Sequence, residues 1–547
     1  MSKGMKTEEQ LGPDRGFEFE TDDEENQARR QADAGSSSSF SSSSGDNSRG
    51  SISTTDRCDG PQGSYQPSWP QSYRQSIDLL SSVLSPGAGF LAGSSLLQLG
   101  NSFRGGSTAG DDYQHSQLAK PLIPHPLPST GAHTSSIVSP HSKPASFFYP
   151  SVLPPPPRCS TSQAIVNGLN VLCGVGILTT PYAIKEGGWM GLILLVFLGF
   201  ISFYTGILLM RCLDISPELQ TYPDVGQAAF GAPGRLCIAI VLYLELYASC
   251  VEYIILVSDS LSSIFPSSHA NLLGIDLSCN QLFALTAALA ILPTVWLRDL
   301  NLLSFLSAGG VIASILMVLC LFWDGMVDGV GFHQEGTVLN LTNLPVALGM
   351  FSFCYSGHSV FPNIYSSMIE QSQFSNVLLV CFILCTSIYA AVAAAGFMMF
   401  GESIQSQFTL NMPHRFMSSR IAIWATVVNP LTKYALTMTP VALSIEELLP
   451  SKHQSIFVAV VIRTLLVIST LVVALLIPFF GFLMALLGSF FTMLVALILP
   501  CLCYLSIQRQ SVTIWEVVLC MFIIMVGVLC AAIGSYSSIK EMVDSYG

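Results

Sequence analysis

Two short stretches of sequence decide the fold of this chain. Residues 173–181 read CGVGILTTP, and residues 354–362 read CYSGHSVFP. Both lie inside long apolar runs, and in each a glycine, Gly176 or Gly357, is followed five positions later by a proline. A membrane helix tolerates such an interruption where the freed backbone groups line a cavity or meet other protein groups. The two stretches therefore predict two broken membrane helices; the alternative is a pair of kinks that only help helices to pack.

Eleven apolar runs are found on counting outward from these stretches. Each is close to the roughly 20 residues that a helix needs to cross the hydrocarbon, and none shows the alternation of a membrane barrel strand. The runs are residues 161–183, 189–212, 235–264, 280–297, 300–323, 344–368, 375–400, 418–446, 455–477, 480–504 and 513–536. The interrupted runs are the first and the sixth, which is typical of a 5+5 inverted repeat that binds substrate where the broken helices cross. We predict an all-α polytopic membrane protein of about eleven helices.

Charged residues are few and unevenly distributed. Of the 547 residues, 50% are hydrophobic and 11% are charged, whereas a soluble domain carries about 25% charged residues. Residues 160–547 hold only 11 Lys or Arg and 19 Asp or Glu. We therefore expect a transmembrane domain at residues 160–540 behind a polar tail at residues 1–159. The net charge of −12 lacks the basic footprint of nucleic-acid binding.

The tail at residues 1–159 is rich in serine, proline and glycine. Such a composition buries too little apolar surface to offset the entropy of ordering, so we expect a disordered tail. It shows no signal peptide, because the first long apolar run begins after residue 160. A serine-rich acidic tail can contact sorting or regulatory proteins, and a plain tether is the alternative.

The loop charges favour a cytoplasmic N-terminus. With the tail in the cytoplasm, the predicted inside loops carry six Lys or Arg and the outside loops carry three, a modest positive-inside bias. Asn340 begins an N-glycosylation sequon in the predicted outside loop at residues 324–343. We therefore treat Asn340 as a candidate glycosylation site.

The sequence shows no sign of enzymatic or metal chemistry. Most of the 15 cysteines lie inside apolar runs, where they act as small hydrophobic residues. The spacings at Cys381/Cys385 and Cys501/Cys503 have no histidine or acidic companions, so we expect no metal site. No nucleophile with its base and no cofactor motif is visible, and we predict neither a cofactor nor an enzyme.

The two breaks suit a zwitterionic ligand. The half-helix that begins after the first break offers N–H groups and a positive dipole end to a carboxylate. The first half of the sixth run ends in carbonyl groups that can bind an ammonium group. The candidate substrate-binding residues are Asn170, Gly174, Val175, Gly176, Ser356, Gly357 and His358.

Four stretches carry a resemblance to a known family: residues 167–178 (NGLNVLCGVGIL), 222–231 (YPDVGQAAFG), 353–358 (FCYSGH) and 429–434 (NPLTKY). They resemble the amino acid/auxin permease family, most of all its plant vacuolar amino acid transporter branch. The resemblance covers the apolar region and leaves the tail uncovered. It implies eleven helices, a LeuT-type core and secondary active transport of amino acids, in this branch usually driven by protons.

Ionisable residues inside apolar runs are costly and mark candidate functional positions. Glu245, Glu252 and Asp259 are spaced seven apart, so they share one helix face. We regard Glu245 and Glu252 as candidate proton carriers, the alternative being a structural pair with Lys433 or with backbone groups. The resemblance suggests that Lys433 occupies the place of a coupling cation and makes it the third candidate in proton coupling. His358 is the histidine beside the sixth-run break, either a lining residue or a packed one.

Two functions remain open on this sequence. The first is a secondary active transporter that moves amino acids, expected to be neutral ones, across the vacuolar membrane at the expense of the proton gradient. Its partners are the amino acid, protons, the lipid bilayer and, at the tail, sorting or regulatory proteins. The second is an amino acid sensor with a transporter fold that signals through the tail.

Overall fold

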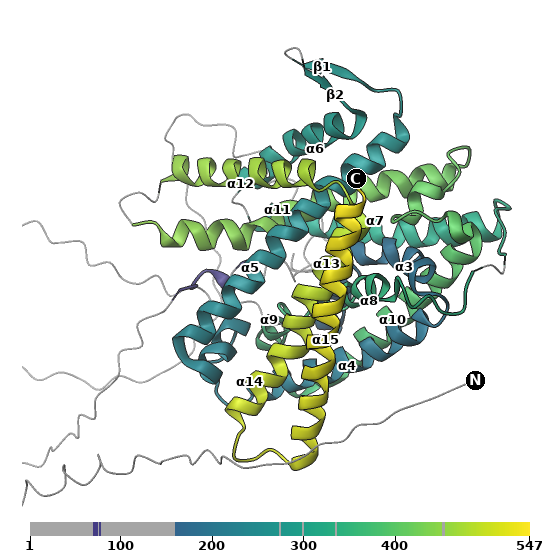
Figure 1. Ribbon diagram of the computed structural model, residues 1–547. Coiled ribbons are helices and arrows are strands. Elements are labelled where there is room, and N and C mark those ends of the chain that lie inside the picture. The colour runs from purple at the N-terminus through teal and green to yellow at the C-terminus, as the bar shows by residue number, and fades with distance from the viewer. Residues whose placement is uncertain are drawn as a thin grey trace, which may run out of the picture. The chain divides into compact units, whose positions relative to one another are not determined.

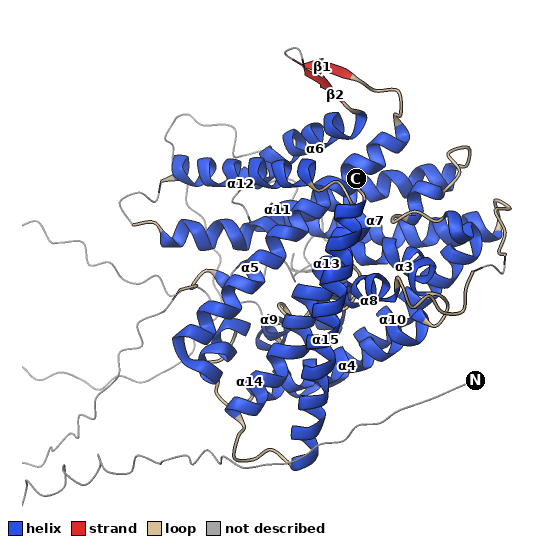
Figure 2. Cartoon of the chain, viewed as in Figure 1, coloured by secondary structure: helices blue, strands red, loops and turns tan. Residues whose placement is uncertain are grey.

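The computed structural model describes residues 69–74, 76–77, 159–272, 275–297, 300–333, 336–450 and 455–546. Within these ranges the chain is almost entirely helical (Figure 1), and a two-stranded hairpin supplies the β structure (Figure 2). Most of the tail that we expect to be disordered lies outside the described residues. The fold class agrees with the sequence prediction of an all-α membrane protein.

The first span is broken where the sequence predicts. It consists of α2 (Thr161–Leu172), the 3-10 helix η2 (Val175–Thr179) and α3 (Thr180–Gly187). The second half is bent by 47° relative to α2. The Ser160 hydroxyl caps the start of α2 by accepting a hydrogen bond from the backbone N–H of Gln163, and the backbone N–H of Ser160 donates to the Gln163 side-chain oxygen.

The sixth span is broken as well. Its halves are α8 (Leu344–Phe353) and α9 (Phe361–Ser367), joined by seven residues without regular helix. Proline stands in the first turn of α9 and of α3, where its missing N–H has no helical partner to lose. Both predicted interruptions are thereby confirmed as breaks between separate helices.

The other predicted runs are helical too. They are α4 (Gly191–Leu213), α5 (Tyr222–Ile264), α6 (Cys279–Trp296), α7 (Leu300–Met326), α10 (Phe374–Phe400), α11 (Met417–Leu448), α12 (Ile456–Leu476) and α15 (Ile514–Asp544). The tenth run holds α13 (Phe480–Leu486), the π-helix η7 (Leu487–Ile498) and α14 (Leu499–Ile507). Short 3-10 helices, η3 (Gln371–Gln373), η4 (Gly401–Ser403) and η5 (Phe408–Asn411), flank α10. The strands β1 (Ala270–Leu272) and β2 (Ile275–Leu277) pair antiparallel after α5.

Length and hydropathy alone select fewer spans than eleven. Eight described helices are long and apolar enough to cross a membrane, or nine with α2 and η2–α3 counted as one bent span. The runs left out are α11 and the α8–α9 pair. α11 carries Lys433, Glu446 and Glu447 and several hydroxyl groups, and α8 and α9 are each short. They are therefore polar or divided, as expected of helices that line a cavity.

Helix α5 begins well before the predicted run at 235–264. It starts at Tyr222, capped by Thr221, and contains a kink at Gly231, whose φ of 70° is in the left-handed region that favours glycine. Residues 222–230 form a short helical segment of their own. After the kink at Gly231 the chain continues as the long apolar part of α5. The apolar count missed this piece because it carries polar and small residues such as Asp224 and Gly226.

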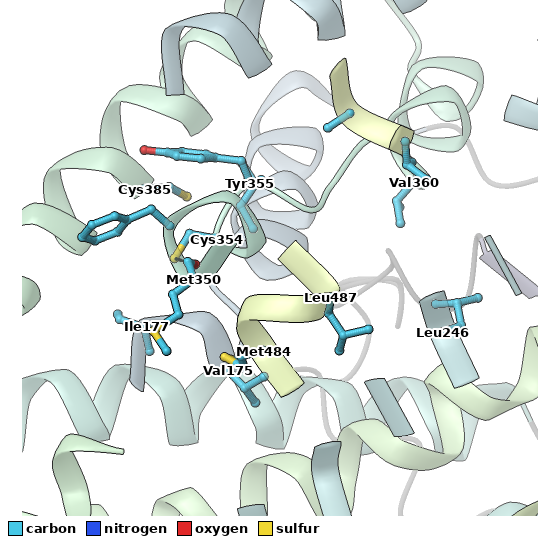
Figure 3. Close-up of a cluster of buried hydrophobic side chains, with 14 of the residues drawn as sticks. Val175, Ile177, Leu246, Met350, Cys354, Tyr355, Val360, Cys385, Met484 and Leu487 are labelled. Atoms are coloured by element: carbon cyan, nitrogen blue, oxygen red, sulfur yellow. Dashed lines mark hydrogen bonds between the residues drawn. The ribbon is translucent and has the colours of Figure 1, made fainter. Parts of the chain in front are cut away.

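The core surrounds the two broken spans. Figure 3 shows Val175 and Ile177 of η2, Met350 of α8 and Met484 of α13 close together. Tyr355 and Cys385 lie above them in this view. The backbones of α8 and η7 approach so closely that a Cβ built on Gly488 would lie 1.8 Å from the carbonyl oxygen of Gly349. Small residues allow such close approach between membrane helices.

We predict that Gly488→Ala destabilises the protein by about 1–3 kcal/mol, the usual effect of overpacking a well-packed core. The added methyl group must displace the α8 backbone, which cannot turn away as a flexible side chain can. Thermal unfolding in detergent measures the change. Gly309→Ala is the matched control, since its Cβ would meet its nearest neighbour, Thr432 Cγ2, at 3.9 Å. Equal melting temperatures of the two variants would contradict backbone contact between α8 and η7.

Candidate functional site

A cavity of ≈ 110 Å³ lies between the two broken spans and helices α5 and α11. One water needs about 10–15 Å³ measured in the same way, so this cavity has room for a larger solute. Its lining residues are Asn170, Val171, Leu172, Gly174, Val175, Gly176, Glu245, Leu246, Ser249, Tyr253, Phe353, Ser356, Ser359, Val360, Lys433, Leu436 and Thr437.

The backbone at the first break faces this cavity. Helix η2 begins after Gly174 without a side-chain cap, so its first N–H groups lack the usual side-chain partner. A Cβ built on Gly174 would meet nothing nearer than the Leu172 carbonyl oxygen at 4.0 Å, which shows open space in front of this residue. The first break therefore presents main-chain atoms to a ligand.

Tyr389 of α10 holds the two breaks together. Its hydroxyl group lies within hydrogen-bonding range of the carbonyl oxygen of Leu172, and 3.1 Å from that of Cys354. The side chain is fully buried. One phenol thus binds the carbonyl group of the last residue of α2 and that of the residue directly after α8, and the breaks are fixed relative to each other.

Glu245 connects α5 to the sixth-span break. The Ser356 hydroxyl donates a hydrogen bond of 2.6 Å to Glu245 Oε1. Glu245 is 5% exposed and lines the cavity. A change in the charge of this carboxyl group therefore acts directly on the Ser356 side chain at the break.

Lys433 of α11 also lines the cavity and is buried. The Lys433 stem packs against α7, where a Cβ on Gly310 would lie 3.2 Å from Lys433 Cε. Among the residues that the structure describes, no carboxylate lies within ion-pair distance of the Lys433 ammonium group. The alternative of a structural Glu–Lys pair therefore has no support in these contacts.

Three predicted residues lie outside the cavity lining. Glu252 is fully buried, and neither of its carboxyl oxygens has a hydrogen-bond partner among the described residues. Gly357 packs instead, since a Cβ there would lie 3.0 Å from Leu172 Cδ2 and from the Phe361 ring. His358 faces α4, with its Nε2 3.1 Å from both Thr205 Oγ1 and the Ser202 carbonyl oxygen.

The helical angle explains why Glu245 and Glu252 differ. At 100° per residue, Leu246, Ser249 and Tyr253 point about 100°, 40° and 80° to one side of Glu245, whereas Glu252 points about 20° to the other side. The cavity-facing stripe on α5 thus runs through Ser249 and Tyr253. Reasoning from the acidic residues alone missed these two, although their positions four and eight residues after Glu245 carry the signal.

Other lining residues come from the same elements. Thr437 is one turn beyond Lys433 and donates a hydrogen bond to the Lys433 carbonyl oxygen. Ser359 and Val360 continue the sixth-span break.

No cluster of three metal-ligating side chains occurs in the described part of the chain. Asn340 is half-buried in the loop before α8, and its Oδ1 accepts a hydrogen bond from the Thr342 amide.

The chain is similar in sequence to a known family and to known proteins. Residues 157–540 match the family described as "Transmembrane amino acid transporter protein". The Arabidopsis thaliana protein "Amino acid transporter AVT1C" is 54% identical over 500 residues, covering 88% of this chain and 90% of that protein. "Amino acid transporter AVT1B" of the same organism is 53% identical, covering 88% and 89%. A crystal structure of MhsT with L-phenylalanine aligns with a TM-score of 0.45 and 16% identity, covering 69% of this chain and 98% of that chain.

The family match extends over most of the chain and spans every residue that lines the cavity. The relatives share about half of their residues with this chain over nearly their whole length. The chain therefore belongs to the transmembrane amino acid transporter family.

Proposed function

We propose that this protein is a secondary active transporter that moves neutral amino acids across the vacuolar membrane and is driven by the proton gradient. The observation that carries the proposal is the cavity between the broken spans, which presents a carboxyl group and an ammonium group that do not pair with each other. An amino acid carries an ammonium group and a carboxylate on the same carbon atom, so a site for it needs groups of both signs close together. The relatives named above are amino acid transporters.

In this proposal the breaks bind the zwitterion. The N–H groups at the start of η2 bind the substrate carboxylate, and the carbonyl groups that end α8 bind the ammonium group. Glu245 takes up a proton when the cavity opens to the acidic side. Because Glu245 accepts the Ser356 hydrogen bond, the proton changes the sixth-span break at the moment of loading.

Lys433 supplies a fixed positive charge where a coupling cation would otherwise bind. The ammonium group is held in the cavity wall by the packing of its stem on α7. A cycle with a permanent cation there does not need sodium. The tail is on the cytoplasmic side in this proposal, and Asn340 and its loop face the lumen of the organelle.

The direct test is uptake of labelled neutral amino acids into proteoliposomes that contain the purified full chain. An imposed pH gradient should drive accumulation, and a protonophore should abolish it. Binding of amino acids without any uptake would favour the sensor function instead. A tagged full chain should cofractionate with vacuolar membranes; recovery in another membrane would contradict the location.

We predict that Gly174→Leu abolishes uptake while the protein still inserts and folds. The new side chain extends into open space in the cavity, so it occupies the substrate volume without displacing packed atoms. Gly174→Ala should have a smaller effect because it removes less volume. Gly357→Leu also loses transport, but by a packing clash, and should lower the melting temperature as well. Full uptake by Gly174→Leu would show that the cavity does not hold the substrate.

We predict that Glu245→Gln lowers proton-driven accumulation more than substrate exchange between the two sides. Exchange needs alternation with substrate bound but no net proton movement, and glutamine can still accept the Ser356 hydrogen bond. Glu252→Gln is the matched comparison, because Glu252 is buried on the same helix away from the cavity lining. Equal loss of both activities in Glu245→Gln would assign Glu245 a structural role and place the proton path elsewhere.

We predict that wild-type transport ignores sodium and that Lys433→Ala abolishes it. Removing the ammonium leaves a desolvated cation site near Thr437, so high sodium should restore part of the activity. Lys433→Arg should not restore it, since a planar guanidinium differs in shape from a compact ammonium group. Lys540→Ala removes the same charge from an exposed position and serves as the control. Wild-type rates from Lys433→Ala without sodium would exclude the cation role.

A further inference from the structure

A short segment of the tail packs against the transmembrane helices. Residues 69–74 and 76–77, here called the docked segment, lie beside α5 (purple in Figure 1). Tyr73 is 1% exposed and Ile77 is 0% exposed. Side chains of this size lose their water contact completely only inside a packed interface.

Glu447 at the end of α11 binds the start of the docked segment. Its carboxylate accepts hydrogen bonds from the backbone amides of Gln71 (2.8 Å) and Ser72 (3.1 Å) and from the Ser72 hydroxyl (2.9 Å). A carboxylate that accepts several N–H groups at the start of a helical turn acts as a cap. Trp69 adds a bond from its indole N–H to the Ser444 carbonyl oxygen at 3.0 Å.

Helix α5 binds the same segment from the other side. The Arg235 guanidinium donates to the carbonyl oxygens of Trp69 (3.2 Å) and Pro70 (3.0 Å). The rings of Trp69 and Tyr73 pack on Tyr243, with ring centroids 5.7 and 5.9 Å from that of Tyr243. The segment is therefore wedged between α5 and α11.

Tyr73 reaches the lining of the central cavity. Its hydroxyl donates a hydrogen bond of 3.1 Å to the carbonyl oxygen of Ser359, which lines the cavity at the sixth-span break. Just beyond, the Asn363 side-chain amide of α9 donates to the Arg74 carbonyl oxygen at 3.1 Å. Tyr73 thus contacts the lining of the cavity that we propose as the substrate site.

The contacts place the docked segment on one side of the cavity. On α5 the docking residue Tyr243 precedes the lining residue Glu245, and on the antiparallel α11 the docking residue Ser444 follows the lining residue Thr437 by about 10 Å of helix. In the sixth span the lining residue Ser359 likewise leads on to Asn363, which contacts the docked segment. On α5, α11 and the sixth span, the docking residues therefore lie on the same side of the cavity. We call this side the tail face.

We propose that the docked segment is an intramolecular plug that closes the tail-face mouth of the cavity and must leave before substrate can pass. The plug's effect on transport rests on the proposed function, but closure of the mouth does not. Because the Ser72 hydroxyl lies against the Glu447 carboxylate, a negative charge at Ser72 repels Glu447 and releases the plug.

Closure can be measured without transport. Ser249→Cys places a thiol in the cavity wall, and a membrane-impermeant thiol reagent is applied to the tail face of vesicles that contain the full chain. The labelling rate is taken as the increase over the chain without this cysteine. We expect slow labelling, and about tenfold faster labelling with Tyr73→Ala, as for truncation of a buried aromatic anchor.

Charge variants separate release from misfolding. Ser72→Asp should speed labelling severalfold. Asparagine has nearly the size of aspartate but no charge, so Ser72→Asn should leave the labelling rate within twofold of the parent. Glu447→Lys combined with Ser72→Asp replaces repulsion by attraction and should return slow labelling. Hydrogen exchange of the docked segment should rise and fall in the same order.

Transport by the same variants is measured in parallel. Faster uptake by Tyr73→Ala and Ser72→Asp supports both the plug and the proposed function. Faster labelling with no uptake by any variant leaves the plug standing and refutes transport. Equal labelling of the parent and Tyr73→Ala, or unprotected exchange of the docked segment in the parent, overturns the plug even if every variant transports.

Discussion

The structure depends on one constraint: main-chain polar groups at membrane depth must find partners inside the protein. Two spans are interrupted, and lipid offers no hydrogen-bond partners to the carbonyl and N–H groups that the interruptions leave free. The protein brings both interruptions together and places Tyr389 between the carbonyl groups of Leu172 and Cys354. The groups that remain available face a shared cavity. The cavity that we propose as the substrate site therefore lies where the two interruptions meet.

The same constraint explains which side chains surround the cavity. Glu245 and Lys433 are ionisable groups that would be costly in lipid, and both face the cavity. Ser356 donates its side-chain hydroxyl to Glu245, so the carboxyl group on α5 is joined to a side chain of the broken sixth span by one hydrogen bond. Glu252, on the same helix, faces packed protein and has no such connection. A position only 20° away on the helical wheel therefore has a different environment.

Helices α5 and α11 have two roles along their length. Each lines the cavity near its middle and binds the docked segment nearer the tail face. Tyr243 and Glu245 are two residues apart, so movement of α5 that opens the cavity also moves the surface on which Trp69 and Tyr73 pack. On the proposed plug mechanism, α5 and α11 thus couple the cavity to the tail.

The sequence by itself determined the spans, their two interruptions and the family. Apolar length places a helix in the membrane irrespective of its neighbours, so the predicted runs agree with the helices to within a few residues at most ends. Only the tertiary structure decided which polar residues meet. It separated Glu245 from Glu252 and turned His358 toward α4. It also brought Tyr73 to Ser359, 286 positions further along the chain. Such contacts depend on the rotation and packing of whole helices, and local sequence patterns do not specify these.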